Sequence, residues 1–255
     1  MSDPASIKIP SEIDGLLARS FFFGVLAHVL RHPSAADRSF FTERDSDLSQ
    51  AVDALSCSQK EKLRTLLPLL FRMCREVNQT EQIRDYECSF QHTAHGKIPA
   101  YELEYGEEHS HRQPQELSDI SAFYQAFGLN VSMSSHERAD HVSAECEFLH
   151  FLLFKEAYAL RQGTKEQASI CRDASRKFLS EHLGSWLPAF AFRLSKYGCG
   201  EIMPVAADFA LELMICESEA SGVCLGDQNL PLRSPEEKEE VACASCALNQ
   251  NPEQL

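Results

Sequence analysis

The sequence predicts an all-α protein: one compact multi-helix domain of about eight or more helices, followed by an acidic, mostly disordered tail. Apolar residues recur at spacings of three and four along most of the 255-residue chain, as amphipathic helices require. Glycine and proline are sparse, with 11 of each, and alternating β-branched stretches are hard to find. The balance of 44% hydrophobic and 24% charged residues is that of an ordinary globular protein.

The helices are expected where periodic segments lie between capping and stop residues. Ser11 is the expected cap of the first helix and Pro33 its stop, while Gly128 and Gly163 end two later helices. Pro68 lies inside the second long helix, where it is expected to break or kink the chain. The expected helices cover residues 11–31, 59–79, 116–127, 136–161, 164–182, 186–197 and 204–217.

Two stretches lack a long helical period. Residues 34–58 are mixed and polar, which predicts short helices and turns. Residues 85–112 contain Gly96, Pro99 and Gly106, which predicts a long connection of the kind that often carries function. The histidines of this connection are expected to be solvated, because their spacing fixes no metal geometry; they are His92, His95, His109 and His111.

Beyond Gly222 the sequence becomes polar and acidic, which divides the chain into a helical domain at 1–219 and a flexible tail at 220–255. The tail holds Cys243-Ala244-Ser245-Cys246, a Cys-x-x-Cys motif without the second pair that a structural zinc site usually needs. This motif could bind metal between two chains, form a disulfide, or have no role. The remaining cysteines, from a total of ten, are scattered singly through helical patterns, which predicts reduced and buried side chains.

The formal net charge of −14 argues against nucleic-acid binding, which depends on clustered lysine and arginine. It suits a basic partner, or simply maintains solubility. The apolar run at 21–27 follows Asp3, Glu12 and Asp14, whereas an export signal has a basic start. The run is also shorter than the roughly 20 residues that span a bilayer. We therefore expect a soluble, cytoplasmic protein without membrane insertion.

The stretch SSHERADHVSAECEFL, which begins at Ser134, gathers acids and histidines at the start of the longest expected helix. Ser134 followed by Glu137 predicts a capping box, and Glu137 and Asp140 would lie where the helix dipole favours negative charge. Glu137, His141 and Glu145 are also spaced to share one face, where they could hold a divalent metal with a fourth ligand from elsewhere. Asp140 and His141 do not form a catalytic pair, because adjacent helical side chains diverge by about 100°.

The sequence lacks the P-loop, the dinucleotide-binding fingerprint and the nucleophile elbow. No complete catalytic set is left, so we expect a protein that is not an enzyme. Two alternatives stay open. One is a metal-dependent helical enzyme that uses Glu137, His141 and Glu145 or the loop histidines, and the other is a scaffold in which Cys243 and Cys246 bind zinc between chains.

Several motifs follow one another in a particular order. Tyr86 and Phe90 come before the segment IPAYELEY at 98–105, which is followed by Glu116-Leu117 and then by FYQAFGL at 123–129. The segment ERADH at 137–141 then runs into ECEFL at 145–149, and FLSEHLGSWLP at 178–188 closes the series with a His-Leu-x-x-Trp-x-Pro element. In this order the motifs resemble the TorD/DmsD family of redox-enzyme maturation chaperones, and the likeness covers roughly residues 10–217.

The resemblance implies an all-helical cytoplasmic chaperone of the TorD type, without catalysis of its own. It implies no cofactor, although guanine nucleotide binding has been suggested for some relatives. The partner would be the apo catalytic subunit of a dimethyl-sulfoxide-reductase-type molybdoenzyme, and in many members also its twin-arginine signal peptide. Such a chaperone holds back export until the molybdopterin cofactor is inserted, and it would act as a monomer or homodimer.

By the same likeness, the partner-binding region lies where the Pro99–Tyr105 loop meets the long helix. Asp140 would contribute charge, His141 a hydrogen bond, and the tyrosines amphipathic contact area. Each of them could instead be a capping or packing residue. The expected partner-binding residues are Asp140, His141, Glu137, Tyr101, Glu102, Tyr105, Pro99 and Trp186.

Two features depart from the family pattern. Many members have a proline between the glutamate and the Asp-His pair, whereas this chain has Arg138-Ala139. The acidic tail with its Cys-x-x-Cys is not a general feature of the family. It leaves open a subgroup with a different client, or a metal-related role for the tail.

Overall fold

A computed structural model gives the structure of the protein and describes residues 11–44, 48–90, 96–106, 113–131 and 137–233. Over these ranges the fold is all-α, as the sequence predicts, with ten α-helices, one short 3-10 helix and no strand. None of the described helices is long and apolar enough to cross a lipid bilayer. The elements are α1 (Glu12–Val29), α2 (Ala35–Glu43), α3 (Leu48–Asp53), α4 (Lys60–Glu76), α5 (Gln79–Phe90), η2 (Glu102–Glu104), α6 (Gln113–Ala126), α7 (Val142–Arg161), α8 (Lys165–Glu181), α9 (Leu183–Tyr197) and α10 (Ile202–Ser221).

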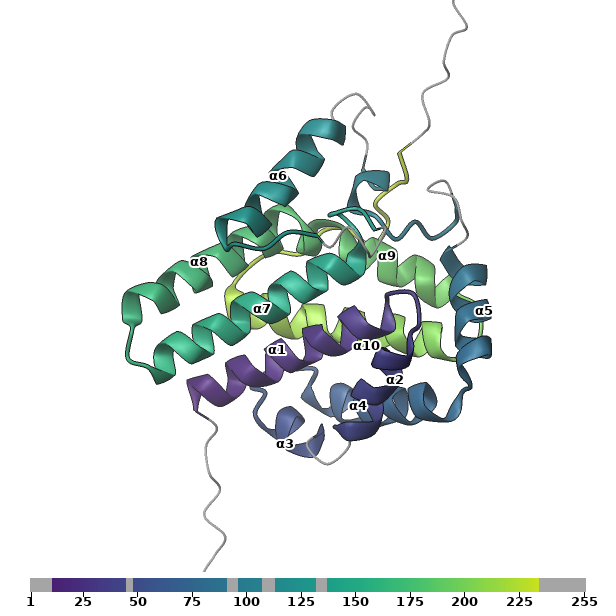
Figure 1. The fold of residues 1–255 in the computed structure, drawn as a ribbon, viewed down its shortest axis with the longest axis horizontal. Helices are drawn as coiled ribbons and strands as arrows, with labels where there is room; N and C mark the ends of the chain where they lie inside the picture. Colours follow the sequence, from purple (N-terminus) through teal and green to yellow (C-terminus); the bar gives the residue numbers. More distant parts are fainter. Residues whose placement is uncertain (1–10, 45–47, 91–95, 107–112, 132–136, 234–255) are drawn as a thin grey trace, which may run out of the picture.

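The centre of the fold is the antiparallel pair of α1 and α7, which lie side by side across the middle of the molecule (Figure 1). Phe22 of α1 and Leu149 of α7 are buried in the shared core. Ser20 Oγ lies 2.9 Å from His150 Nδ1 and also donates to the His150 carbonyl. Gly24 lets the same imidazole approach, since a Cβ there would lie 3.3 Å from Nδ1. The first helix is therefore fixed by a partner from the middle of the chain.

The remaining helices surround this pair. α8 packs along α7, α9 packs against α8 and α10, and α4 packs against α10. α6 lies at the outer edge of the molecule, beside η2 (Figure 1). Aromatic rings fill the space between α6, α7 and α8: the ring of Phe148 lies 4.8 Å from those of both Tyr124 and Phe178. This cluster fixes α6 next to the start of α7.

Several helix ends fall where the sequence predicts them. Ser11 caps α1 in a capping box with Asp14. Gly128 and Gly163 follow α6 and α7 with φ of 73° and 76°, values that favour glycine. Pro68 does not break its helix, because α4 continues through it from Lys60 to Glu76 with buried leucines on both sides.

The expected connection at 85–112 is helical in its first part, where α5 extends to Phe90. Sequence periodicity misses this helix because its buried residues are few and half of them are polar; they are Asp85, Tyr86, Ser89 and Phe90. The irregular part begins later and contains η2. The four histidines expected in this connection, His92, His95, His109 and His111, lie outside the described residues.

The expected helix at 136–161 begins only at Val142, so the predicted start is wrong. His141 is the N-cap, and its side chain accepts a hydrogen bond from Ser143 N. Glu137 and Asp140 therefore precede the helix and do not occupy its first turn. Ser134, the predicted cap, lies outside the described residues.

Four cysteines form disulfides, contrary to the prediction that they are reduced. Cys57 is bonded to Cys216 and Cys88 to Cys199, across separations of 159 and 111 residues. Such separations leave no local pattern that a sequence reader could recognise. Cys74, Cys146 and Cys171 are free and buried, as predicted, and Cys224 is free and exposed. Burial and the nearby charge of Asp37 raise the pKa of Cys74 to about 12.

The chain after α10 lies against the domain as far as residue 233, and we call residues 222–233 the C-terminal strap. Gly226 N donates to Gly184 O at 2.9 Å, in a contact too close for any side chain at Gly226. The strap then runs to Leu232, which forms an antiparallel bridge with Tyr105. The predicted domain boundary at 219/220 falls inside α10, and the rest of the predicted tail, including Cys243 and Cys246, lies outside the described residues.

Replacing both partners of the second disulfide, Cys88→Ser with Cys199→Ser, should lower the free energy of unfolding of the oxidised protein by about 2–4 kcal/mol. The bond limits the freedom of the unfolded chain, and Cys88 is exposed, so its replacement removes little packing. Urea denaturation with and without dithiothreitol measures the effect. Reductant should bring the wild type down towards the stability of the variant, and equal stability of the two oxidised proteins would contradict the assignment.

Candidate functional site

The motifs singled out in the sequence meet at the start of α7. We define the junction as three segments, residues 98–106, 137–142 and 182–186. Backbone hydrogen bonds join the first two, from Glu102 N to Asp140 O (2.9 Å) and from Val142 N to Ala100 O (2.8 Å). The irregular loop is thus paired with the residues that lead into the helix.

Asp140 is the centre of the junction and has no exposed surface. Its two carboxylate oxygens accept hydrogen bonds from Arg138, at 2.9 Å from Nε and 2.5 Å from Nη2. Leu103 N donates to the same carboxylate at 3.2 Å. Arg138 Nη1 also donates to Glu104 Oε1 at 3.1 Å, so one guanidinium joins two acids. The charge of Asp140 is therefore balanced within the chain.

His141 is also buried and acts mainly through local contacts. Its Nδ1 lies 2.7 Å from Ser143 Oγ, and its Nε2 lies 3.5 Å from Tyr86 Oη and 3.8 Å from Glu137 Oε2. Burial lowers the pKa of His141 below its ordinary value, although the charges of Glu137 and Asp140 act in the opposite direction. The imidazole is therefore neutral near neutral pH and serves as a cap.

The two tyrosines of the loop differ in exposure. Tyr101 is partly exposed; its hydroxyl donates to Glu137 Oε2 at 2.7 Å, and Arg138 lies 4.7 Å above its ring. Tyr105 is buried, and its hydroxyl donates to Pro99 O at 2.9 Å. One tyrosine can meet a partner at the surface, whereas the other closes the loop on itself.

The third segment of the junction is attached through a buried acid, Glu145 of α7. Trp186 Nε1 donates to Glu145 Oε2 at 3.1 Å, and the Trp186 ring lies 5.1 Å from that of Tyr105. Burial raises the pKa of Glu145 well above its ordinary value, and the charge and hydrogen bond of Glu102 raise it further. His182 Nδ1 lies 3.1 Å from Glu102 Oε1. These contacts connect the start of α9 to the loop.

All eight expected partner-binding residues lie in the junction, but few of them are accessible. The buried ones are Pro99, Tyr105, Asp140, His141 and Trp186. The partly exposed ones are Tyr101, Glu102 and Glu137. The structure separates the residues with accessible surface from those that are buried and hold the loop in place, and the role of either group in binding stays a prediction.

Sequence reasoning missed two residues that hold the junction together. Arg138 was noted only as a departure from the family pattern, yet it holds both Asp140 and Glu104. Tyr124 of α6 donates its hydroxyl to Ala139 O at 2.8 Å. The sequence does contain a signal for Arg138, because a cation two residues before an acid in a non-helical segment is a ready ion-pair partner.

The alternative metal site is not assembled. Glu145 points to Trp186, and Glu137 bonds to Tyr101. Over the part of the chain that the structure describes, no group of three or more His, Cys, Asp or Glu is placed to hold a metal ion. The loop histidines of the metal alternative and the zinc alternative at Cys243 and Cys246 fall outside these residues, and both stay predictions.

A groove of about 670 Å³ adjoins the junction at Glu137. Its floor is apolar, with Phe148, Phe151 and Phe154 from α7, and its acidic groups are Glu137 and Glu147. Phe154 is 48% exposed and gives the groove an accessible aromatic side chain. The lining of this α7 groove is Arg31, His32, Ser34, Tyr124, Leu129, Asn130, Val131, Glu137, Ser143, Ala144, Glu147, Phe148, His150, Phe151 and Phe154.

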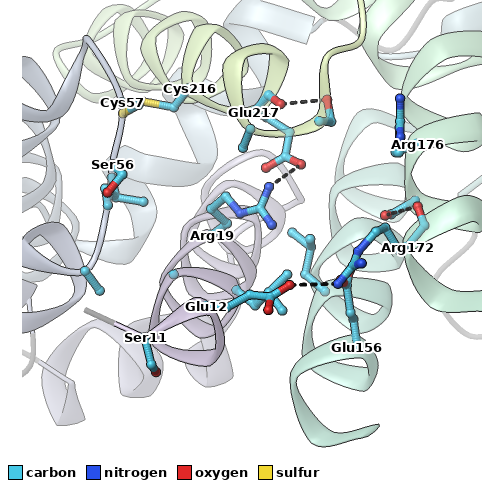
Figure 2. A pocket seen from close by; sticks show the side chains of 18 residues that line it. Ser11, Glu12, Arg19, Ser56, Cys57, Glu156, Arg172, Arg176, Cys216 and Glu217 are labelled. Atoms are coloured by element: carbon cyan, nitrogen blue, oxygen red, sulfur yellow. Dashed lines mark hydrogen bonds and ion pairs between the residues drawn. A yellow bond between two sulfur atoms is a disulfide. The ribbon is translucent and has the colours of Figure 1, made fainter. Parts of the chain in front are cut away.

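A second cavity, of about 340 Å³, lies between α1, α8 and α10 (Figure 2). Arg19 Nη1 pairs with Glu217 Oε1 at 3.0 Å, and Arg172 lies between Glu156 (2.6 Å) and Glu12 (2.8 Å), as Figure 2 shows. Burial raises the pKa of Glu217, although Arg19 lowers it. Because these charges are paired with one another, the cavity is a weaker candidate than the α7 groove for recognising a polypeptide.

The structure is all-helical over the described residues, and the ordered motifs of the sequence meet at the junction beside the α7 groove. A sequence model of the family described as "Nitrate reductase delta subunit" matches residues 50–191, more than half of the chain, and the chain belongs to this TorD-like family. The family resemblance seen in the sequence is thereby confirmed.

Three relatives illustrate the likeness. The chlorate reductase assembly chaperone protein of Ideonella dechloratans is 38% identical over 78 residues, which are 31% of this chain and 39% of the relative. The perchlorate reductase assembly chaperone protein of Dechloromonas aromatica is 28% identical over 198 residues, 74% of this chain and 81% of the relative. The chaperone protein TorD of Vibrio cholerae is 33% identical over 86 residues, 34% of this chain and 38% of the relative. These names describe chaperones, in agreement with the prediction that the chain is not an enzyme.

Glu145→Gln should make the stability of the protein less dependent on pH. The folded state raises the pKa of Glu145 above 4.5, its ordinary value. Between these two pKa values, the folded protein keeps the proton on Glu145, whereas the unfolded chain has released it. The stability contributed by the protonated acid is complete below pH 4.5 and is lost as the pH rises through the raised pKa. The variant should match the wild type in stability below pH 4.5 and exceed it at alkaline pH by about 1–3 kcal/mol.

Urea denaturation over a series of pH values measures this difference. Glu166→Gln, at an exposed position of α8, is the matched control and should show no comparable gain. A difference between Glu145→Gln and wild type that stays constant with pH would contradict the assignment.

Proposed function

We propose that the protein is a cytoplasmic assembly chaperone for the apo catalytic subunit of a dimethyl-sulfoxide-reductase-type molybdoenzyme. It would bind the subunit, and its twin-arginine signal peptide where one is present, until the molybdopterin cofactor is inserted, and so delay export. Support comes from the family and from relatives named as reductase assembly chaperones. The matches to the chlorate reductase chaperone and to TorD span only 39% and 38% of those relatives, so the client is inferred by class.

The observation that carries the proposal is the α7 groove beside the junction. A twin-arginine signal peptide presents arginines next to an apolar stretch. Carboxylates such as Glu137 and Glu147 can bind guanidinium groups, and the three phenylalanines of the floor can receive apolar side chains. The overall charge of −14 favours a basic segment as well.

Within this proposal, the junction residues have two kinds of role. Tyr101, Glu102 and Glu137 are accessible and would contact the client directly. Asp140 and His141 would act indirectly, because they are buried and hold the loop at the start of α7. The same indirect role applies to Pro99, Tyr105 and Trp186.

Phe154→Asp should weaken binding of a twin-arginine signal peptide at least about tenfold, since it places a charge where an apolar contact of about 1.5–3 kcal/mol is expected. Isothermal titration calorimetry with a synthetic signal peptide of a reductase catalytic subunit measures this, together with co-purification of the apo subunit. Ile170→Asp is the matched control, because Ile170 is an apolar residue of α8 with 55% exposure outside the groove. Binding should be unchanged in that variant.

Two results would count against the proposal. If the wild type binds neither the signal peptide nor the apo subunit, the chaperone function fails. If the two aspartate variants weaken binding equally, the client does not occupy the α7 groove.

A further inference from the structure

The end of the C-terminal strap places an arginine on the junction. Arg233 Nε donates to Tyr105 O at 2.9 Å, and Arg233 Nη1 donates to Glu116 Oε2 of α6 at 2.8 Å. Only 10% of the Arg233 side chain is exposed. A guanidinium thus fills a site composed of one backbone carbonyl and one carboxylate.

The backbone around this arginine is bound in the manner of an added strand. Gly106 N donates to Pro231 O, and Arg233 N donates to Glu104 O, both at 2.9 Å. These bonds flank the antiparallel bridge between Tyr105 and Leu232. Extended peptides bind to exposed backbone edges in this way, with main-chain bonds for affinity and side-chain sites for specificity.

Gly106 shapes the edge so that an arginine can lie across it. Its φ is 116°, a conformation that L side chains rarely adopt. A Cβ at Gly106 would stand 3.6 Å from Arg233 Nε, directly beside the bound guanidinium. The glycine therefore provides the turn that lies at van der Waals distance from the guanidinium.

The site distinguishes arginine from lysine. Its two acceptors, Tyr105 O and Glu116, are met by two different nitrogens of one planar guanidinium. An ammonium group is a compact charge on a flexible stem and cannot reproduce this fork. The nearby acids Glu104 and Asp140 already share Arg138, so an incoming arginine relies on Glu116.

We propose that this edge, residues 104–106 together with Glu116, is a recognition site for an arginine within an extended segment of the client, and that Arg233 occupies it in the free chaperone. The identity of the segment as part of a reductase client rests on the proposed function. The strap is then an internal competitor that the client displaces. Because it is tethered, its effective concentration is high, and it lowers the apparent affinity for any arginine peptide.

The test uses the full chain and a fluorescent peptide that copies residues 226–233, GDQNLPLR, with an amidated C-terminus. Arg233→Ala in the protein should release the strap and tighten binding of this peptide about tenfold, measured by fluorescence anisotropy. Adding Glu116→Gln to that variant should remove the gain, because it removes the acceptor. Arg161→Ala, at an exposed arginine at the other end of α7, is the control and should bind as the wild type does.

The peptide itself provides a second comparison. A peptide with Arg233→Lys should bind the Arg233→Ala protein about tenfold more weakly, because it loses the fork geometry. Equal binding of the peptide to wild type and to Arg233→Ala, or a gain that survives Glu116→Gln, would overturn the proposal. Circular dichroism checks that each variant is folded. Arg233→Lys in the protein is a milder replacement, for which we expect a smaller gain in peptide affinity.

Hydrogen exchange separates this inference from the proposed function. Binding of the signal peptide to the wild type should accelerate exchange at the amide of Arg233 as the strap leaves, whereas the amide of Gly106 stays hydrogen-bonded, now to the incoming segment. If the signal peptide binds without faster exchange in the strap, the strap does not compete with the client, while the chaperone function stands. If the signal peptide does not bind but GDQNLPLR binds Arg233→Ala as described, the arginine site stands and the proposed signal-peptide binding fails.

Discussion

The arrangement of the candidate site depends on the buried ion pair between Asp140 and Arg138. A carboxylate without exposed surface is stable only when charge and hydrogen bonds replace its hydration. Here the guanidinium and the amide of Leu103 supply them, and in doing so they fix where the loop at 98–106 crosses the start of α7. Since Arg138 also binds Glu104, whose carbonyl receives the strap, the same pair positions the edge on which the strap lies.

One short loop thereby serves two surfaces. Tyr101, before η2, donates to Glu137, which lines the α7 groove, while Tyr105, after η2, carries the edge occupied by Arg233. Between them, the partly exposed Glu102 lies next to the buried residues Glu145 and His182. Movement of this loop cannot be confined to one surface, because both ends are tied to the same three-residue turn.

The sequence predicts helices best where burial follows a regular stripe, as in α4, and worst where polar residues share the buried face, as in α5. The motifs that the sequence orders along the chain lie together at the junction, and their role as a binding site stays a prediction. The sequence did not show that Asp140 and His141 are buried, because their cover comes from a loop more than thirty residues earlier in the chain. The disulfides and the contact of Arg233 with Tyr105 are equally non-local: each joins residues more than a hundred positions apart, beyond the reach of periodicity or spacing.

The pairing of α1 with α7 has a consequence for synthesis of the chain. Ser20 meets His150, 130 residues later, and the buried face of α1 includes Phe22 and Phe23. At roughly 5–20 residues per second, a ribosome needs on the order of ten seconds to deliver the matching helix. During that interval the first apolar helix has emerged without its main partner, so this protein is itself a candidate for early protection by general folding factors during translation.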